Sequence, residues 1–346
     1  MEPTRSSRTG PLRGYRCRVS STVPVASSPG TPPAASVDLS TSVPRTGSPW
    51  PHRLLWANLV AQVGIVVTGG AVRLTGSGLG CSTWPQCEPG QFAPVLHEAT
   101  SLHPYIEFGN RTLTGVLGVL ALLTAVVVWR RPGRSRGFRV LGLVPLVGVA
   151  VQAVVGGLTV LVDLHPAWVG SHFAISMLLV AASMALVVRH REGDGVPEPL
   201  VDARTTLLSR ALVPLGAAVV LLGVVTTGAG PHSGDAEVGY RFALDPALVA
   251  RGHAASVWLF VAGVVALVVL TRPAATHERP RRAARVLLAV TLAQGAVGYV
   301  QYFTGLPELL VGVHMLGAAV LVAAQTAQVL SLRRRGPLAV AQVVTT

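Results

Sequence analysis

The chain has 346 residues, of which 50% are hydrophobic and only 12% charged, with a mean hydropathy of +0.54. This composition excludes an ordinary soluble domain and is typical of a protein with many membrane helices. A formal net charge of +13 would suggest nucleic acid in a soluble protein, but the basic residues here follow membrane topology instead. We therefore expect the lipid bilayer, and no nucleic acid, among the partners.

Runs of roughly 20 apolar residues follow one another along the chain, each long enough to cross about 30 Å of hydrocarbon. They occupy residues 54–72, 106–129, 139–162, 167–188, 209–229, 248–271, 285–304 and 308–332. The sequence thus predicts an all-α membrane protein with eight transmembrane helices.

Every one of the 28 cationic residues is Arg, and all but four lie before the first run, after the last, or in the alternate loops on that same side. The positive-inside rule assigns this side to the cytoplasm. We expect a multi-pass protein of the cell membrane with both termini cytoplasmic. The four exceptions, at the outer side, are Arg73, Arg111, Arg241 and Arg251.

The two halves of the chain repeat each other. "VGSHFAISMLLVAA" at 169 returns as "VGVHMLGAAVLVAA" at 311, which aligns His172 with His314, and the same frame sets Asn110 against His253. This similarity predicts two four-helix bundles of the same topology. The expected parts are a disordered cytoplasmic tail (1–50), an N-terminal half (51–190), a cytoplasmic linker (191–208), a C-terminal half (209–335) and a second cytoplasmic tail (336–346).

Four polar residues of the repeat lie at a similar depth, about four to seven residues in from the outer end of their helices. They are Asn110, His172, His253 and His314. A polar side chain inside a bilayer is costly, so it usually faces a partner, a cavity or a cofactor. Two imidazoles on opposite helices, such as His253 and His314, are the usual way to hold a haem iron from both sides. Interhelical hydrogen bonding is the alternative, but it gives no reason for a matched depth, so we favour haem.

The four outer arginines also fit a haem. Each could pair with a propionate, Arg73 and Arg111 in the N-terminal half and Arg241 and Arg251 in the C-terminal half. Snorkelling of the same side chains to the membrane interface explains them equally well.

Two cysteines, Cys81 and Cys87, flank "STWPQ" in the first outer loop, on the oxidising side where a disulfide can persist. The short loop would contribute only about 2 to 2.5 kcal/mol by chain entropy, so a redox role and a structural role stay equally open. Zinc held by this pair together with His97 and His103 is a weaker interpretation.

Several motifs occur in one order along the eight predicted helices: "GGAVRLTGSGLGCSTWPQC", "IEFGNRTLTG", "VGSHF", "TTGAGPHSGD", "GHAAS" and "VGVHMLGA". Together, over about residues 50–332, they resemble the haem A synthase family, and the combination is highly specific. The resemblance implies a membrane oxidoreductase that oxidises the ring methyl of haem O to the formyl group of haem A for cytochrome oxidase. It also implies haem b as the cofactor of the C-terminal half, haem O as the substrate of the N-terminal half, and a cysteine pair over the substrate pocket.

The resemblance carries over to individual residues. His253 and His314 match the family's haem b ligands, and His172 matches one histidine of the N-terminal pair. The other member of that pair, normally in a Glu-x-x-His-Arg arrangement, is Asn110 here. An amide is a poor iron ligand, so this departure argues against two histidines holding the substrate haem.

Glu107 matches the family's catalytic carboxylate, one helical turn before Asn110 and on the same helix face. A carboxylate at this place could accept a proton or position water near the carbon that is oxidised. The alternative is a structural ion pair with Arg111, four residues on. We favour catalysis, mainly because of the resemblance.

The family also implies haem O synthase and cytochrome oxidase assembly proteins as partners. Two other functions stay open. A membrane electron-transfer cytochrome would show paired histidines but gives Glu107 no role. A small-molecule transporter would explain the repeat but not histidines at one depth.

Overall fold

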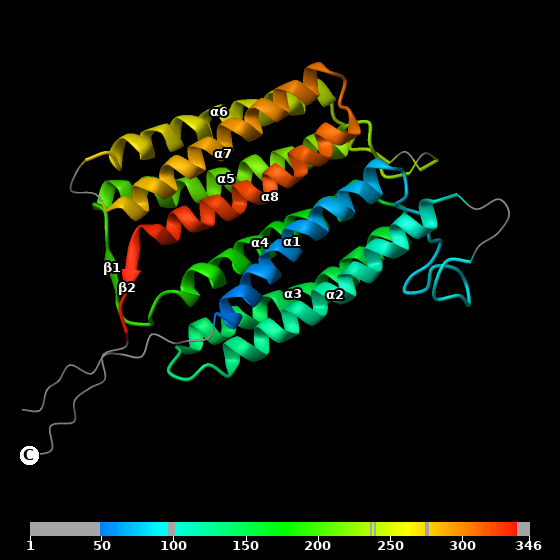
Figure 1. The fold of residues 1–346 in the computed structure, drawn as a ribbon. Helices are drawn as coiled ribbons and strands as arrows, with labels where there is room; N and C mark the ends of the chain where they lie inside the picture. Colours follow the sequence, from blue (N-terminus) through cyan, green and yellow to red (C-terminus); the bar gives the residue numbers. More distant parts are fainter. Residues whose placement is uncertain (1–48, 96–100, 236, 239, 274–276, 338–346) are drawn as a thin grey trace, which may run out of the picture. The chain divides into compact units, whose positions relative to one another are not determined.

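The apolar runs form helices, as the sequence predicts. The computed structural model describes residues 49–95, 101–235, 237–238, 240–273 and 277–337. In this part of the chain eight helices are long and apolar enough to cross a membrane (Figure 1). They are α1 (Trp50–Leu74), α2 (His103–Trp129), α3 (Arg136–Leu161), α4 (Pro166–His190), α5 (Ala203–Ala229), α6 (Pro246–Leu270), α7 (Glu278–Phe303) and α8 (Glu308–Ser331). The protein is therefore an all-α, multi-pass membrane protein; the predicted tails, 1–50 and 336–346, lie almost entirely outside the described residues.

Several helices begin before the apolar run that predicts them. Helix α5 begins at Ala203, where the Asp202 carboxylate accepts a hydrogen bond of 2.7 Å from the Thr205 amide, and α7 begins at Glu278. An apolar run marks only the part of a helix inside hydrocarbon, whereas a polar cap lets the helix continue into the interface. The spans were thus predicted correctly, and at α5 a side-chain cap accounts for the earlier start.

Packing divides the helices into two groups that meet along one seam. Helices α1 to α4 lie against one another, as do α5 to α8, and α8 also packs against α1 and α4 (Figure 1). Ala319 of α8 is fully buried among Leu55, Val180 and Leu186 of the first group. A small residue at such a crossing lets the backbones approach closely.

Large apolar side chains cover the outer faces of the bundle. Val60 is 64% exposed, Val154 is 55%, Leu178 is 69% and Leu259 is 61%. In water such a surface would be unfavourable, but hydrocarbon accepts it, and the helices satisfy their own backbone hydrogen bonds. Two pairs of polar side chains bond between helices inside the bundle: Asn58 donates to Ser183 at 3.0 Å, and Ser209 donates to Gln328 at 2.9 Å.

The segment between α4 and α5 is ordered by charge and by a short strand pair that the sequence does not predict. Strand β1 (Pro197–Pro199) pairs antiparallel with β2 (Arg333–Arg335), just after α8. The carboxylate of Asp194, 1% exposed, accepts from Arg134 and Arg189, both at 2.6 Å, and from the amide of Ser135 at 2.9 Å. Asp194 therefore ties the α2–α3 loop to the end of α4.

Replacing Asp194 with Asn should destabilise this end of the bundle. Burial by itself would raise the pKa of Asp194, but the hydrogen bonds from Arg134 and Ser135 outweigh it and lower the pKa to about 2. Because the folded pKa lies below the ordinary value of 3.8, the stabilisation is present above that pH and disappears as the pH falls toward 2, and we expect it to be about 2 kcal/mol. The measurement is thermal unfolding of both proteins in detergent between pH 7 and pH 2.

The matched control is Glu198→Gln. Glu198 pairs with Arg334 at 2.8 Å, but both side chains are more than 60% exposed, so its loss should cost less than about 1 kcal/mol. If both variants lost the same stability at pH 7, Asp194 would not be the residue that holds the α2–α3 loop to the end of α4.

Candidate haem site

A cavity of about 780 Å³ lies among the helices of both groups. It is lined by all of the predicted catalytic, ligand and arginine positions, and the two cysteines are the only predicted site residues in the described part of the chain that do not line it. The lining residues among them are Arg73, Glu107, Asn110, Arg111, His172, Arg241, Arg251, His253 and His314. The folded chain thus gathers residues from five helices and one loop around a single space.

His253 of α6 and His314 of α8 face each other across part of this cavity. Their ring centres lie 6.5 Å apart, and the ring planes are nearly perpendicular at 83°. The Nδ1 atoms of both rings, and of His172 in α4, are buried without a hydrogen-bond partner of good geometry. An imidazole that lies within the membrane span and lines a cavity is costly by itself, and a group bound in that cavity is the usual reason for keeping it there.

Each of these three imidazoles packs on a glycine of the preceding helix. A Cβ atom added to Gly156 would lie 3.1 Å from Cε1 of His172, and one added to Gly298 would lie 3.1 Å from Cε1 of His314. Gly223 stands in the same relation to His253, at 3.2 Å. A methyl group at any of the three glycines would require the imidazole to shift by a few tenths of an ångström, so the glycines let the rings sit close to the neighbouring helix.

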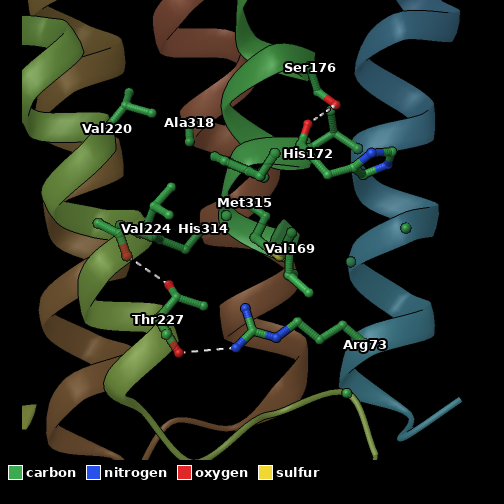
Figure 2. A pocket seen from close by; sticks show the side chains of 18 of the residues that line it. Arg73, Val169, His172, Ser176, Val220, Val224, Thr227, His314, Met315 and Ala318 are labelled. Carbon is green, nitrogen blue, oxygen red and sulfur yellow. Dashed lines mark hydrogen bonds between the residues drawn. The ribbon is translucent and has the colours of Figure 1, made fainter. Parts of the chain in front are cut away.

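One helical turn before two of these glycines, a glutamine holds the backbone beside the histidine. Gln152 donates to the carbonyl of His172 at 2.9 Å, and Gln294 donates to the carbonyl of His314 at 2.8 Å. The Gln152 amide also donates to the Ser176 hydroxyl at 2.5 Å. Figure 2 shows His172 and Ser176 on α4, with His314 on the neighbouring helix. The same contact thus recurs at both histidines that the sequence repeat aligns.

Asn110 does not form a histidine-like site. Its Oδ1 accepts a hydrogen bond of 2.7 Å from the Thr68 hydroxyl of α1, and its amide nitrogen lies toward Gly69. An amide nitrogen has no free lone pair for a metal, and the oxygen here is already engaged. The contact with Thr68 keeps Asn110 at the cavity wall as a neutral polar group.

Glu107 and Arg111 form the ion pair that the sequence left as the alternative to catalysis. The two side chains pair directly, and Glu107 is only 5% exposed. The second carboxylate oxygen of Glu107 accepts from the Cys81 amide at 2.7 Å. Arg111 also donates to the carbonyls of Thr83 at 3.0 Å and Gln86 at 3.1 Å. Arg111 is therefore occupied by Glu107 and by the outer loop.

That loop carries the predicted disulfide. Cys81 and Cys87 are joined, and both are fully buried. The cysteines themselves do not line the cavity. Hydrogen bonds of Glu107 and Arg111 connect their loop to α2. The structural role is thus visible in the contacts, while a redox role stays a prediction.

Among the other outer arginines, Arg73 makes the most contacts. Its guanidinium donates to the carbonyl of Thr227 at 3.0 Å (Figure 2). It also donates to the carbonyl of His232, and these two bonds connect α1 to the end of α5 and the loop that follows it. In the described part of the chain these partners are neutral carbonyls, so the positive charge can still attract an anion. Arg241 likewise donates to the Pro231 and Tyr240 carbonyls, and Arg251 to the Ala247 carbonyl of its own helix.

Among the cavity-lining residues that sequence reasoning did not single out are Trp84 and Met315. Trp84, inside the disulfide loop, lines the cavity. Its only signal in the sequence was a large aromatic residue between two cysteines. Met315, next to His314, lies against Gly70 of α1. That contact crosses the seam between the groups, so no local pattern could predict it.

Comparison with known proteins finds a match over residues 52–246 to the COX15-CtaA family, described as cytochrome oxidase assembly protein. The matched segment contains Glu107, Asn110 and His172 but ends before His253 and His314. The candidate C-terminal ligands therefore rest on the geometry above and on the sequence repeat.

Curated relatives named heme A synthase are similar over part of the chain. That of Bacillus licheniformis is 31% identical over 39% of this chain and 43% of its own length. That of Lysinibacillus sphaericus is 34% identical over 38% and 43%, and that of Bacillus cereus is 31% identical over 43% and 46%. The matches thus span less than half the length of these relatives.

Replacing Arg111 with Met should loosen the disulfide loop. The change removes the hydrogen bonds to the loop carbonyls and the ion pair with Glu107 but leaves the cysteines in place. We expect a hydrophilic phosphine to reduce the disulfide at least several-fold faster than in the parent, as measured by thiol alkylation and mass spectrometry on membranes.

The control is Arg251→Met, because Arg251 bonds to a carbonyl of its own helix and not to the loop. Reduction at the parent rate in the Arg111 variant would show that Arg111 does not hold the loop.

Proposed function

Because the chain belongs to the COX15-CtaA family of cytochrome oxidase assembly proteins, we propose that it is a haem A synthase, an oxidoreductase of the membrane. Its reaction would convert a ring methyl group of haem O into the formyl group of haem A. The observation that supports this most is one cavity lined by both a carboxylate, Glu107, and three buried imidazoles, those of His172, His253 and His314. A transporter function would leave the three buried imidazoles that pack on glycines unexplained. An electron-transfer cytochrome would have no role for Glu107.

The residues of the C-terminal group fit haem b as a resident cofactor. Two imidazoles that bind one metal ion from opposite sides, with nitrogens about 2 Å from it, have ring centres roughly 6 to 6.5 Å apart. The observed separation of His253 and His314 is 6.5 Å. Arg241 and Arg251, at the same cavity, would pair with the propionates. When bound, the haem would supply one-electron transfer.

The N-terminal group is proposed to bind haem O. His172 would face the substrate iron, Arg73 would attract a propionate, and Asn110 would line the pocket without ligating. Arg111 serves mainly to hold the loop and Glu107. This assignment differs from the sequence-based proposal of Arg111 as a propionate partner because its donors already have carbonyl and carboxylate acceptors.

Glu107 is the proposed catalytic residue. Oxidation of a methyl group replaces its C–H bonds by C–O bonds, so protons must leave the reacting carbon and water must approach it. A carboxylate held at the cavity wall can accept such a proton or orient the water. The Cys81 amide and Arg111 keep both of its oxygens in fixed positions. Two successive oxidations, each taking up one water and giving up two protons and two electrons to a one-electron acceptor, would give an aldehyde hydrate, which loses water to form the formyl group.

The organisation of the chain is part of the proposal. We assign residues 51–190 to the substrate half and 209–335 to the cofactor half, joined by the linker 191–208, with both termini in the cytoplasm. Support comes from the recurrent Gln–Gly–His contacts in α3 with α4 and in α7 with α8. Haem O synthase and cytochrome oxidase assembly proteins are the partners that the family implies.

The decisive experiment is the haem content of the purified protein after co-expression with a source of haem O. We expect haem B together with haem A or its alcohol intermediate, resolved by chromatography of the extracted haems. Glu107→Gln should retain haem B and lose most of the oxidised product, because the amide keeps the shape but cannot accept a proton. Haem B alone in the parent would favour an electron-transfer cytochrome, and no haem at all would favour transport.

The glycine that packs against His314 allows a second test of the haem b ligands. Gly298→Ala should displace the His314 ring, because the new methyl would lie 3.1 Å from Cε1, and should reduce or alter the low-spin haem b spectrum. His314→Ala should abolish that spectrum. The matched control is Gly252→Ala next to His253, where an added Cβ meets nothing within 4 Å. A parent-like spectrum in His314→Ala would refute the ligand assignment.

A further inference from the structure

Trp84 is the part of the disulfide loop that reaches the cavity. It stands midway between Cys81 and Cys87, is 38% exposed, and lines the cavity beside residues of α2 and α3. Its indole lies directly on Gly157 of α3, where an added Cβ atom would be 2.5 Å from Cδ2 and 2.6 Å from Cε2. Only glycine allows this approach, so the indole of the loop packs directly against the backbone of α3.

The residue before Gly157 in α3 is Gly156, on which the His172 ring packs. Gly156 contacts the imidazole and Gly157 contacts the indole, so each ring packs on one of two successive glycines of α3. Both rings line the same cavity. This part of the wall is therefore aromatic, with the imidazole of His172 and the larger indole of Trp84 both packed on α3.

The loop that presents Trp84 is held firmly. Arg111 donates to the carbonyls on both sides of the indole, at Thr83 and Gln86, and the Thr83 hydroxyl donates to the Gln86 carbonyl at 2.9 Å. The disulfide closes the loop, and Glu107 accepts from its first cysteine. The indole position is thus set before any ligand enters, which reduces the entropy lost on binding.

We propose that Trp84 positions the substrate, packing its indole against the flat tetrapyrrole that enters beside His172. The inference rests on the proposed function and extends it to a specific contact. Aromatic rings favour offset or edge contacts with other π-systems, and a macrocycle with apolar faces is the ligand class that such a wall accepts. Arg111 is then a positioning residue that acts through the loop.

The test is binding of a flat macrocycle to the purified full-length protein in nanodiscs, with its own haem content quantified. Zinc protoporphyrin is the probe, because its fluorescence reports binding without turnover, and haem O is the competitor. Trp84→Ala should weaken binding roughly tenfold, and Trp84→Phe should stay close to the parent. Gly157→Ala keeps the indole but displaces it, so it should weaken binding as well.

The matched control is Trp168→Ala, since Trp168 of α4 is similarly exposed, at 41%, but does not line the cavity. In haem O oxidation, loss of Trp84 should raise KM more than it lowers kcat. Parent-like affinity in Trp84→Ala with the disulfide intact, or an equal loss in Trp84→Phe, would overturn the inference alone. A parent protein that binds no macrocycle beyond its haem b would overturn the proposed function and this inference with it.

Discussion

The close contact between an imidazole and a glycine on the next helix is the feature on which the candidate site depends. A histidine in hydrocarbon needs a partner for its nitrogens, and a bulky residue opposite would force the ring out of the bundle. Gly156, Gly223 and Gly298 leave room for the rings, while Gln152 and Gln294 fix the backbone at two of them. The three rings therefore line the cavity at positions that the neighbouring helices fix.

Charge at the other side of the cavity is organised differently. Glu107 and Arg111 neutralise each other, and each uses its remaining capacity on the disulfide loop. A buried carboxylate is expensive unless it is paired and hydrogen-bonded, so this arrangement lets the protein keep an acidic group beside an apolar pocket. The same contacts give the loop a fixed path, which connects the chemistry at Glu107 to the wall formed by Trp84.

Contacts between the two helix groups bring the imidazoles and the Glu107–Arg111 pair around one cavity. Helix α8 carries His314 and also packs against α1 and α4, and its Met315 meets Gly70 across the seam. Arg73 bonds the end of α1 to carbonyls of the α5–α6 segment. The proposed substrate and cofactor sites are thus neighbours through rigid packing and not through a flexible linker. Asp194 ties the opposite end of the bundle, where the α2–α3 loop meets the end of α4.

The sequence by itself determined the eight spans, the all-α class, the cysteine pair and the histidines of interest. Hydrocarbon thickness and the need to satisfy backbone hydrogen bonds leave few alternatives to long helices, and a polar residue in an apolar run is visible at once. Only the tertiary structure decided that Arg111 holds a loop, that Asn110 bonds to Thr68, and that Trp84 enters the cavity. These contacts join segments distant in sequence, and their geometry depends on how closely helices approach, which no local periodicity encodes.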